Sequence, residues 1–357
     1  MLINQKFDIE VLAFEREYHS GRMPACPVHK LGRVKNECYY SRIPLFFKAL
    51  FKIRKAANGC DVVYANGPDL AILSFISCLG MRKPIVVEIG DLARMQFSKG
   101  ILSAIFRKIE GFFTSHYQFI VVISSGFLHQ YYRSWLSVRT PGMVIENKLS
   151  GEDMKDLPVI SKDRGKGGRP LLERPLRIGY FGLLRDAWSY EILRALAEEC
   201  ATRFEIIFAG FPVDPSNLSE LVKDSKNMTF AGEYRSPQDL PAIYGGVDMV
   251  WSCYPEIREE DYNFKWGRPN RFYEGCYFKK PFFARKGSMF ADEVEKLSLG
   301  FVINDTDVGT VVSKIKRLNS NQYFQWKDAI DSLPKAFYMY DQEGPELAEN
   351  IRSLKEE

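Results

Sequence analysis

The sequence predicts an α/β protein with two parallel-sheet domains, because short apolar runs alternate with helical stretches in each half of its 357 residues. A single core stops growing well below this length. The hydrophobic share of 46% and the charged share of 26% are typical of globular chains. We expect a first domain over 1–150, a glycine- and proline-rich linker over 151–175, and a second domain over 176–330. A C-terminal helical segment over 331–357, with breaks at Pro334 and Pro345, is expected to cross back to the first domain.

Each half contains apolar runs with the length of buried strands. In the first half they are 9–14, 61–65, 84–88, 119–123 and 143–146, with helices expected over 43–55, 69–79 and 99–113. In the second half they are 176–181, 204–209, 228–231, 249–252, 281–284 and 300–303, with helices expected over 190–200, 237–244 and 270–277. Because the chain enters a strand almost at once, the first βα unit of the N-terminal domain is expected to be absent.

Composition excludes several classes of function. A net charge of +4 is too small to favour nucleic acid as a partner. The seven cysteines form no CxxC pair, and the four histidines have no metal-ligand spacing, so we expect reduced thiols and no metal site. No apolar run is long enough to span a membrane and no signal segment is evident, which predicts a cytoplasmic protein.

A basic amphipathic segment over 43–55 leaves two interpretations open. It places phenylalanines and leucines beside Lys48, Lys52, Arg54 and Lys55. Such a helix can bind an anionic membrane surface, which would locate the protein at the inner face of the membrane. Most helices with this pattern instead bury the apolar stripe against their own sheet.

The strongest local signal is the run RPNRFYEG over 268–275. Pro269 followed by Asn270 predicts a helix start, whose free N–H groups can bind a phosphate, and Arg271 adds a guanidinium. Glu274 lies one turn further, where its carboxylate can accept hydrogen bonds from ribose hydroxyls. The alternative is a capped helix with a charged surface that leads into a strand.

A second run, GYFGLLR over 179–185, ends a strand before a helix. Gly182 lets the backbone approach a ligand there, and Arg185 can reach a pyrophosphate. The GxxG spacing is not the GxGxxG fingerprint of dinucleotide-binding dehydrogenases, so that class is a poor match.

The order of these runs resembles the nucleotide-sugar domain of GT-B glycosyltransferases, especially enzymes similar to glycosyltransferase family 4. GYFGLLR resembles the first turn of that domain, FAGF over 208–211 its second, FAGEY over 230–234 the loop near the base, and RPNRFYEG the helix whose glutamate binds ribose. The resemblance implies two Rossmann-like domains that face each other across a cleft.

The same resemblance implies roles for individual residues. Arg185 and Arg271 would contact the diphosphate, Glu274 the ribose, and Glu233 or Tyr234 would lie near the base. Two positions depart from the family pattern: Trp266 replaces the first glutamate of the E-x7-E motif, and the lysine expected about one turn after Arg185 is absent from 187–190.

In the first half, the run EIGD over 88–91 ends a strand. It resembles acceptor-side loops of these enzymes, so Glu88 or Asp91 could orient or deprotonate an acceptor hydroxyl in an inverting reaction. A turn carboxylate that caps the next helix is the alternative.

We therefore expect transfer of a sugar from a nucleoside diphosphate sugar, UDP-linked, to a saccharide or lipid-linked saccharide in polysaccharide biosynthesis. No metal is expected, so arginines and the helix start would stabilise the leaving diphosphate. Two alternatives remain open: a non-catalytic scaffold or binding subunit of a polysaccharide assembly complex, and a sugar-nucleotide epimerase. The absence of histidine from the second half counts against the epimerase.

Overall fold

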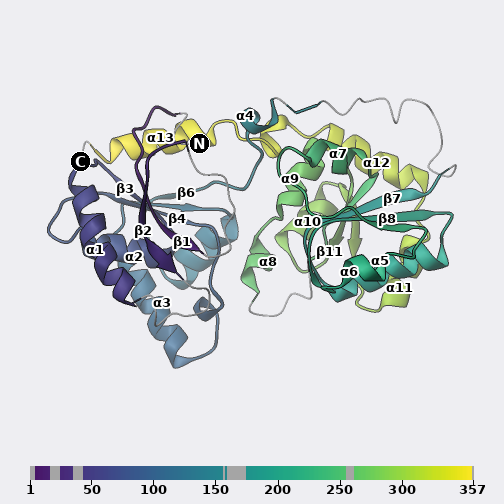
Figure 1. Ribbon diagram of the computed structural model, residues 1–357, viewed down its shortest axis with the longest axis horizontal. Coiled ribbons are helices and arrows are strands. Elements are labelled where there is room, and N and C mark those ends of the chain that lie inside the picture. The colour runs from purple at the N-terminus through teal and green to yellow at the C-terminus, as the bar shows by residue number, and fades with distance from the viewer. Residues whose placement is uncertain are drawn as a thin grey trace. The chain divides into compact units, whose positions relative to one another are not determined.

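The computed structural model describes residues 5–16, 25–34, 43–155, 157–158, 174–254 and 261–355. The chain forms two compact units (Figure 1). Unit 1 comprises Met1–Glu146 and Asp341–Glu357, and unit 2 comprises Asn147–Tyr340.

Unit 1 contains a four-stranded parallel sheet in the order β3-β4-β5-β6. All four residues of β5 are buried, which is typical of parallel strands that are covered on both faces. The strands are β3 (Val63–Asn66), β4 (Ile85–Ile89), β5 (Phe119–Val122) and β6 (Gly142–Val144).

Two further strands of unit 1 pair with each other in parallel: β1 (Val11–Arg16) and β2 (Val28–Val34). The sequence did not predict β2, because only Leu31 and Val34 of its seven residues are buried. Leu31 packs in a small core with Ala49 and Ile53 of α1 (Ile43–Asn58).

Helices α1, α2 (Pro68–Ser77) and α3 (Ile101–Thr114) lie next to one another in unit 1. The chain also forms the short 3-10 helix η3 (Arg94–Gln96) and the π-helix η4 (Phe127–Trp135). The C-terminal helix α13 (Glu343–Ser353) belongs to this unit, where Arg352 donates a 2.7 Å hydrogen bond to the Gln5 carbonyl. The expected break at Pro345 was wrong, because this proline lies in the first turn of α13, where a helix tolerates it.

Unit 2 contains a six-stranded parallel sheet in the order β12-β11-β10-β7-β8-β9. The chain adds β8 and β9 on one side of β7, and then β10, β11 and β12 on the other. The order therefore reverses between β7 and β10, and ligands of open α/β sheets bind at the carboxyl ends of the strands at such a point. The strands are β7 (Leu176–Arg185), β8 (Phe204–Asp214), β9 (Met228–Phe230), β10 (Met249–Trp251), β11 (Phe282–Arg285) and β12 (Gly300–Ile303).

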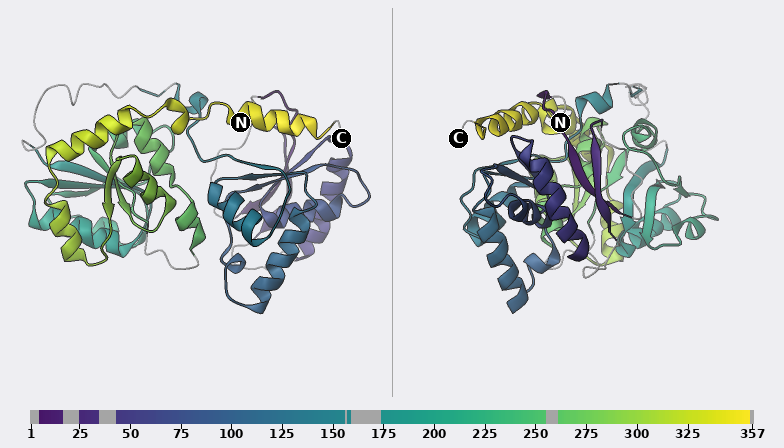
Figure 2. Two further views of the ribbon diagram at one scale, coloured as in Figure 1. Left: turned by 180° about the vertical axis from the view of Figure 1, so that it is seen from behind. Right: turned by 60° about the vertical axis from the view of Figure 1, so that its left-hand side comes forward.

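Helices cover both faces of the unit 2 sheet (Figure 2). Successive residues of β11 point to opposite faces, so Phe283 enters one core while Phe282 and Ala284 enter the other. One core includes α5 (Ala187–Glu199), α11 (Val308–Ile315) and α12 (Ser320–Asp331). The other includes α7 (Leu240–Gly245), α9 (Asn270–Tyr277) and α10 (Met289–Lys296). The described part of the chain also forms α4 (Gly151–Met154), α6 (Leu218–Leu221), α8 (Tyr262–Trp266) and η7 (Lys335–Phe337).

Candidate functional site

Two glycines bring the ends of β7 and β8 close together. Gly182 and Gly210 are partners in the ladder, and their φ angles of +90° and +127° favour glycine. A Cβ atom at Gly210 would lie 2.0 Å from the carbonyl oxygen of Gly182, so only glycine fits there. At Gly182, the atoms nearest to an added Cβ would be Tyr234 Oη at 3.8 Å and Arg271 Nη1 at 4.0 Å. The backbone of Gly182 is therefore bordered by these two polar side chains.

Arg271 lies in the first turn of α9, which begins after Pro269. Its Nη1 donates a hydrogen bond to the carbonyl of Phe181 in β7, and its guanidinium carbon lies 5.3 Å from the centre of the Tyr180 ring. Its Nε is buried and has no hydrogen-bond partner among the described residues. The strand thus fixes the guanidinium while leaving donor capacity for a ligand.

Glu274 lies one turn further along α9 and is only 6% exposed. Its Oε2 accepts a 2.5 Å hydrogen bond from the hydroxyl of Tyr244, which stacks on Phe278. Burial raises the pKa of Glu274 above its usual range, although the Tyr244 hydrogen bond and the charge of Arg271 oppose this effect. The carboxylate is therefore fixed by the scaffold and can still accept further hydrogen bonds, for example from hydroxyl groups.

Tyr234 follows β9 and completes this group. Burial, together with the charge of Glu274, raises the pKa of Tyr234 to about 12, while the charge of Arg271 lowers it. Four of the residues predicted from sequence therefore lie together at the carboxyl edge of the sheet. We call Gly182, Tyr234, Arg271 and Glu274 the β7–α9 site.

The other predicted residues of unit 2 have exposed side chains. Arg185 ends β7, and its guanidinium carbon lies 4.8 Å from the centre of the Phe264 ring in α8. Asn270 is the first residue of α9, and Glu233 precedes Tyr234 in the loop after β9. The first backbone N–H groups of α9 have no intrahelical partner, so they can bind an anion.

Sequence reasoning missed Asp186 and Arg285, two buried charged residues at the same edge of the sheet. Asp186 precedes α5, and Arg285 is the last residue of β11. The sequence shows only that each of these residues lies at the end of an apolar run. That position does not indicate that the charged side chain is buried.

The two acidic residues predicted in unit 1 lie at the end of β4 and directly after it. Glu88 is half-buried and accepts a 2.7 Å hydrogen bond from the hydroxyl of Tyr64. Burial, and to a smaller extent the charge of Glu88, raises the pKa of Tyr64 above its usual value. Asp91 is exposed. The side chain of Asp91 is therefore more accessible to solvent than that of Glu88.

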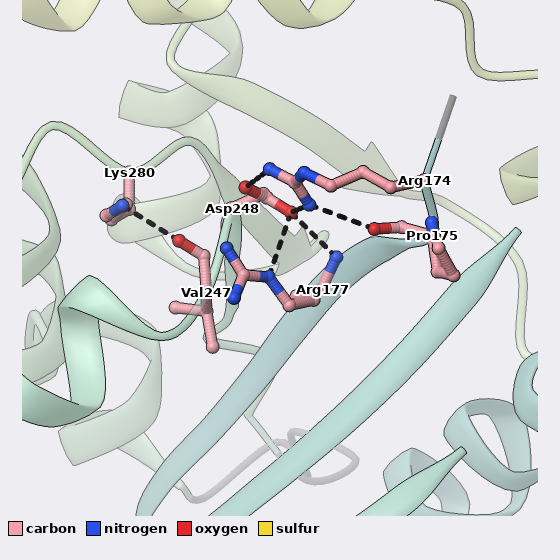
Figure 3. Close-up of polar contacts among 6 residues, drawn as sticks. All are labelled: Arg174, Pro175, Arg177, Val247, Asp248 and Lys280. Carbon is pink, nitrogen blue, oxygen red and sulfur yellow. Dashed lines mark hydrogen bonds and ion pairs between the residues drawn. The ribbon is translucent and has the colours of Figure 1, made fainter. Parts of the chain in front are cut away.

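An ion-pair cluster lies at the opposite, amino edge of the unit 2 sheet (Figure 3). Arg174 donates two 2.6 Å hydrogen bonds to the carboxylate of Asp248, and the Arg177 backbone N–H donates another at 2.9 Å. Burial alone would raise the pKa of Asp248, but these hydrogen bonds outweigh burial and hold it below its usual value. Lys280 donates to the carbonyl of Val247 at 2.8 Å. The cluster joins the start of β7 to that of β10.

A cavity of about 110 Å³ also lies at the amino edge, between Arg174, Arg203, Tyr323 and Trp326. Ligand pockets usually measure about 300–1,000 Å³, so this cavity is small for a nucleotide. Within the described ranges, no group of three His, Cys, Asp or Glu side chains is arranged to hold a metal ion. In the same part of the chain, no helix combines the length and the apolar character needed to cross a membrane.

Comparison with known proteins gives one sequence relative and many structural ones. No family model matches the chain. Its sequence is 28% identical over 319 residues to the succinoglycan biosynthesis protein ExoL of Rhizobium meliloti (strain 1021), which covers 87% of this chain and 78% of ExoL.

Three solved structures illustrate the structural similarity. Sucrose-phosphate synthase from Thermosynechococcus elongatus matches with a TM-score of 0.69 and 13% identity, covering 99% of this chain and 90% of that one. Anabaena HepE in complex with UDP and glucose matches with a TM-score of 0.62 and 16% identity, covering 92% and 86%. A glycosyltransferase from Rickettsia africae ESF-5 matches with a TM-score of 0.60 and 15% identity, covering 92% and 85%. These likenesses show that the chain has the GT-B fold that its sequence predicts.

Proposed function

We propose that this protein transfers a sugar from a UDP-linked donor to a saccharide or lipid-linked saccharide during polysaccharide biosynthesis. The observation that carries the proposal is the β7–α9 site, which combines a close backbone approach at Gly182, the guanidinium of Arg271 and the carboxylate of Glu274. The relative ExoL is named for succinoglycan biosynthesis, and HepE has been solved with UDP and glucose. Both support this choice of donor and process.

The residues of the site suit the departure of a nucleoside diphosphate. In the transfer, the bond between the anomeric carbon and the diphosphate oxygen breaks, and its electron pair leaves with the diphosphate. A bond forms to the acceptor oxygen, which loses its proton. Arg271 and the N–H groups at the start of α9 would stabilise the charge that develops on the leaving group. Glu274 would accept hydrogen bonds from the ribose, and Tyr234 would contact the base.

Arg185, Asn270 and Glu233 would complete the contacts at the exposed side of the site. Arg185 and Asn270 would contact the diphosphate, and Glu233 is a second candidate for the base. In unit 1, Glu88 and Asp91 are candidates to orient or deprotonate the acceptor. The greater exposure of Asp91 favours it over Glu88 as the residue that meets an incoming hydroxyl.

A transfer assay tests the proposal. The purified protein is incubated with radiolabelled UDP-sugars, GDP-sugars or ADP-sugars and with membranes from the organism that encodes it. We expect one UDP-sugar to label a saccharide or lipid fraction, with release of UDP. Arg271→Ala should abolish labelling, whereas Arg203→Ala, which changes a guanidinium at the amino edge, should not. Absence of labelling with every donor would contradict the proposal and favour a scaffold.

We further propose that unit 1 contacts an anionic membrane through α1 and α3. In α1, Ala49 and Ile53 are buried, but Phe47 and Phe51 are exposed, Phe51 by 77%. Part of the apolar stripe is therefore buried in the unit, as the second interpretation of 43–55 expects, and part of it faces solvent. The same helix contains Lys48 and Lys55 and has no acidic residue.

Helix α3 adds a larger apolar surface. Its inner face is fixed by Glu110, which accepts hydrogen bonds from Gln96, Tyr131 and Tyr132. Ile101, which is 82% exposed, begins a row of exposed apolar residues that continues with Leu102, Ile105, Ile109 and Phe112. Apolar side chains beside lysines are suited to the interface of an anionic bilayer.

Vesicle co-sedimentation tests this contact. We expect the protein to bind vesicles that contain phosphatidylglycerol more strongly than neutral phosphatidylcholine vesicles, and to be released by salt. The double variants Phe47→Ser/Phe51→Ser and Ile101→Ser/Leu102→Ser should both bind less. Phe324→Ser, which removes an exposed phenylalanine from unit 2, is the matched control. Equal binding by all variants would contradict the proposed surface.

A further inference from the structure

A second arginine of the carboxyl edge of the unit 2 sheet, Arg285, is buried. Arg285 ends β11, which neighbours β10, and β10 in turn neighbours β7. The residue is only 8% exposed, and its Nη1 is buried without a hydrogen-bond partner among the described residues. Because burial of an unpaired guanidinium is costly, a ligand that satisfies it would explain its presence.

Arg285 lies beside the first turn of α5, at the carboxyl end of β7. Trp188 lies in the first turn of α5, within the segment 187–190 where the family resemblance leads us to expect a lysine. The guanidinium carbon of Arg285 lies 4.2 Å from the centre of the Trp188 ring. The indole thus provides a flat surface against which the guanidinium packs. Arg285 therefore places a cation beside this segment from a different strand.

The neighbouring acid does not use up the donors of Arg285. Asp186 accepts a hydrogen bond from the Ser189 hydroxyl, which itself accepts one from Trp251 Nε1 at 2.8 Å. The charge of Arg285 lowers the pKa of Asp186, but burial has the larger effect and raises it. Asp186 thus acts on Arg285 through its charge, with no ion pair between them within 4.0 Å among the described contacts.

Arg285 and Arg271 lie on the two sides of the end of β10. The buried thiol of Cys253, two residues beyond this strand, is affected electrostatically by both guanidinium groups. Ser252, which precedes it, has a buried hydroxyl without a partner among the described residues. Only β10 separates β11, which ends at Arg285, from β7, to which Arg271 is hydrogen-bonded, so one ligand with two negative groups can reach both arginines.

We infer that Arg285 is the second cation for the donor diphosphate and binds its distal phosphate. The inference rests on the proposed function. Arg271 lies next to Glu274, on the side of the ribose, so it is suited to the phosphate nearest the ribose. Arg285 lies further along the sheet edge, towards β11, where the distal phosphate and the sugar would extend. A guanidinium can donate two hydrogen bonds to one phosphate, which a lysine cannot do with the same geometry.

Calorimetric titration of the full chain with UDP and with UMP tests the inference. We expect Arg285→Gln to weaken UDP binding by about 10- to 100-fold, the range for a lost hydrogen bond to a charged group. Binding of UMP, which lacks the distal phosphate, should change less than about threefold. Arg285→Lys, which keeps the charge, should lie between the wild type and Arg285→Gln. Arg203→Gln, which changes a guanidinium stacked on Phe204 at the amino edge, should affect neither ligand.

The other possible results separate a failure of the Arg285 inference from a failure of the proposed function. UDP affinity that is unchanged in both Arg285 variants would overturn the inference and leave the proposed function intact. Equal weakening of UDP and UMP would overturn it too, because it would indicate a general distortion of the site. If the wild type itself binds neither UDP nor UDP-glucose, the proposed donor site fails and this inference fails with it. Far-UV circular dichroism of the Lys variant controls for folding.

Discussion

The hydroxyl of Tyr244 donates a 2.5 Å hydrogen bond to Oε2 of Glu274 in the interior of unit 2. The two residues come from α7 and α9, so the bond joins the helix that contains the site's carboxylate to a neighbouring helix. Both side chains are buried. The orientation of Glu274 therefore depends on a residue that sequence analysis did not select.

Removal of this hydroxyl should affect both stability and binding. In Tyr244→Phe, the buried carboxylate loses a donor, which typically costs about 1–3 kcal/mol of unfolding free energy. UDP affinity should also fall several-fold, because Glu274 is no longer held in place. Urea denaturation and calorimetry measure the two effects. Tyr190→Phe, a buried tyrosine that packs in the other core, is the control, and equal behaviour of the two variants would argue against a specific role.

The raised pKa of Glu274 predicts a pH dependence of nucleotide binding. The ionised carboxylate accepts hydrogen bonds from ribose hydroxyls, whereas the protonated acid accepts fewer. UDP affinity should therefore increase as the pH rises through the raised pKa of Glu274, above the usual value of 4.5. In Glu274→Gln this increase should vanish. An identical pH profile for the two proteins would show that Glu274 is not the titrating group.

The raised pKa of Glu274 also predicts how the stability of the fold changes with pH. A carboxyl group whose pKa is raised in the folded state stabilises the fold below its unfolded pKa and loses this contribution as the pH rises through the folded value. Wild type should therefore lose stability relative to Glu274→Gln between pH 4.5 and the raised value. A site carboxylate that costs stability is typical of residues kept for function.

Sequence patterns predicted the elements that are determined locally. Helix α9 matches the predicted range 270–277, because Pro269 fixes its start and its apolar residues follow a helical period. The strand β5 was predicted from an uninterrupted apolar run. Gly182 was selected because it follows a predicted strand, Arg271 because it lies in the first turn of a predicted helix, and Glu274 because it lies one turn further along that helix.

The features that sequence missed depend on contacts between distant segments. Strand β2 has an undistinguished sequence and forms because β1 offers it a parallel partner. Arg285 is buried because β11 lies beside β10 and because Trp188, almost 100 residues earlier, packs on it. The burial of a polar residue at a strand end cannot be read from spacing alone.

The Asp248 cluster at the amino edge should contribute to stability and not to binding. The pKa of Asp248 is held below its usual value of 3.8, so its contribution is present above pH 3.8 and is lost as the pH falls through the folded value. At pH 7, Asp248→Asn should lower the unfolding free energy by roughly 2 kcal/mol, with UDP affinity unchanged. Urea denaturation at pH 7 and pH 3 measures the difference, which should shrink at the lower pH.

An exposed ion pair supplies the control for this prediction. Asp239 pairs with Arg235 at the surface, so Asp239→Asn should change stability little. A loss of UDP binding in Asp248→Asn, with the fold intact, would contradict the assignment of this cluster to the scaffold.

The lowered pKa of Lys280 predicts that the folded protein becomes more stable at mildly alkaline pH. Burial lowers its pKa from 10.5 to about 8. Between these two values the unfolded chain binds more protons than the folded protein, so the unfolding free energy should rise with pH. From pH 8 to 9.5, below the pKa of free tyrosine, the gain should be about 1–2 kcal/mol. Lys280→Met should be insensitive to pH in this window, and an equal gain in both proteins would assign the effect to other groups.

The most direct test of the donor site is thermal unfolding with UDP, GDP or ADP, for the wild type and for Arg271→Ala and Glu274→Ala. A diphosphate at a hundredfold excess over its Kd stabilises the protein that binds it by about 2.7 kcal/mol. We expect UDP to raise the Tm of the wild type, GDP and ADP to raise it less, and both variants to lose the UDP effect. If no diphosphate at millimolar concentration changes the Tm of the wild type, the β7–α9 site does not bind a nucleotide, and the proposed transfer reaction is contradicted.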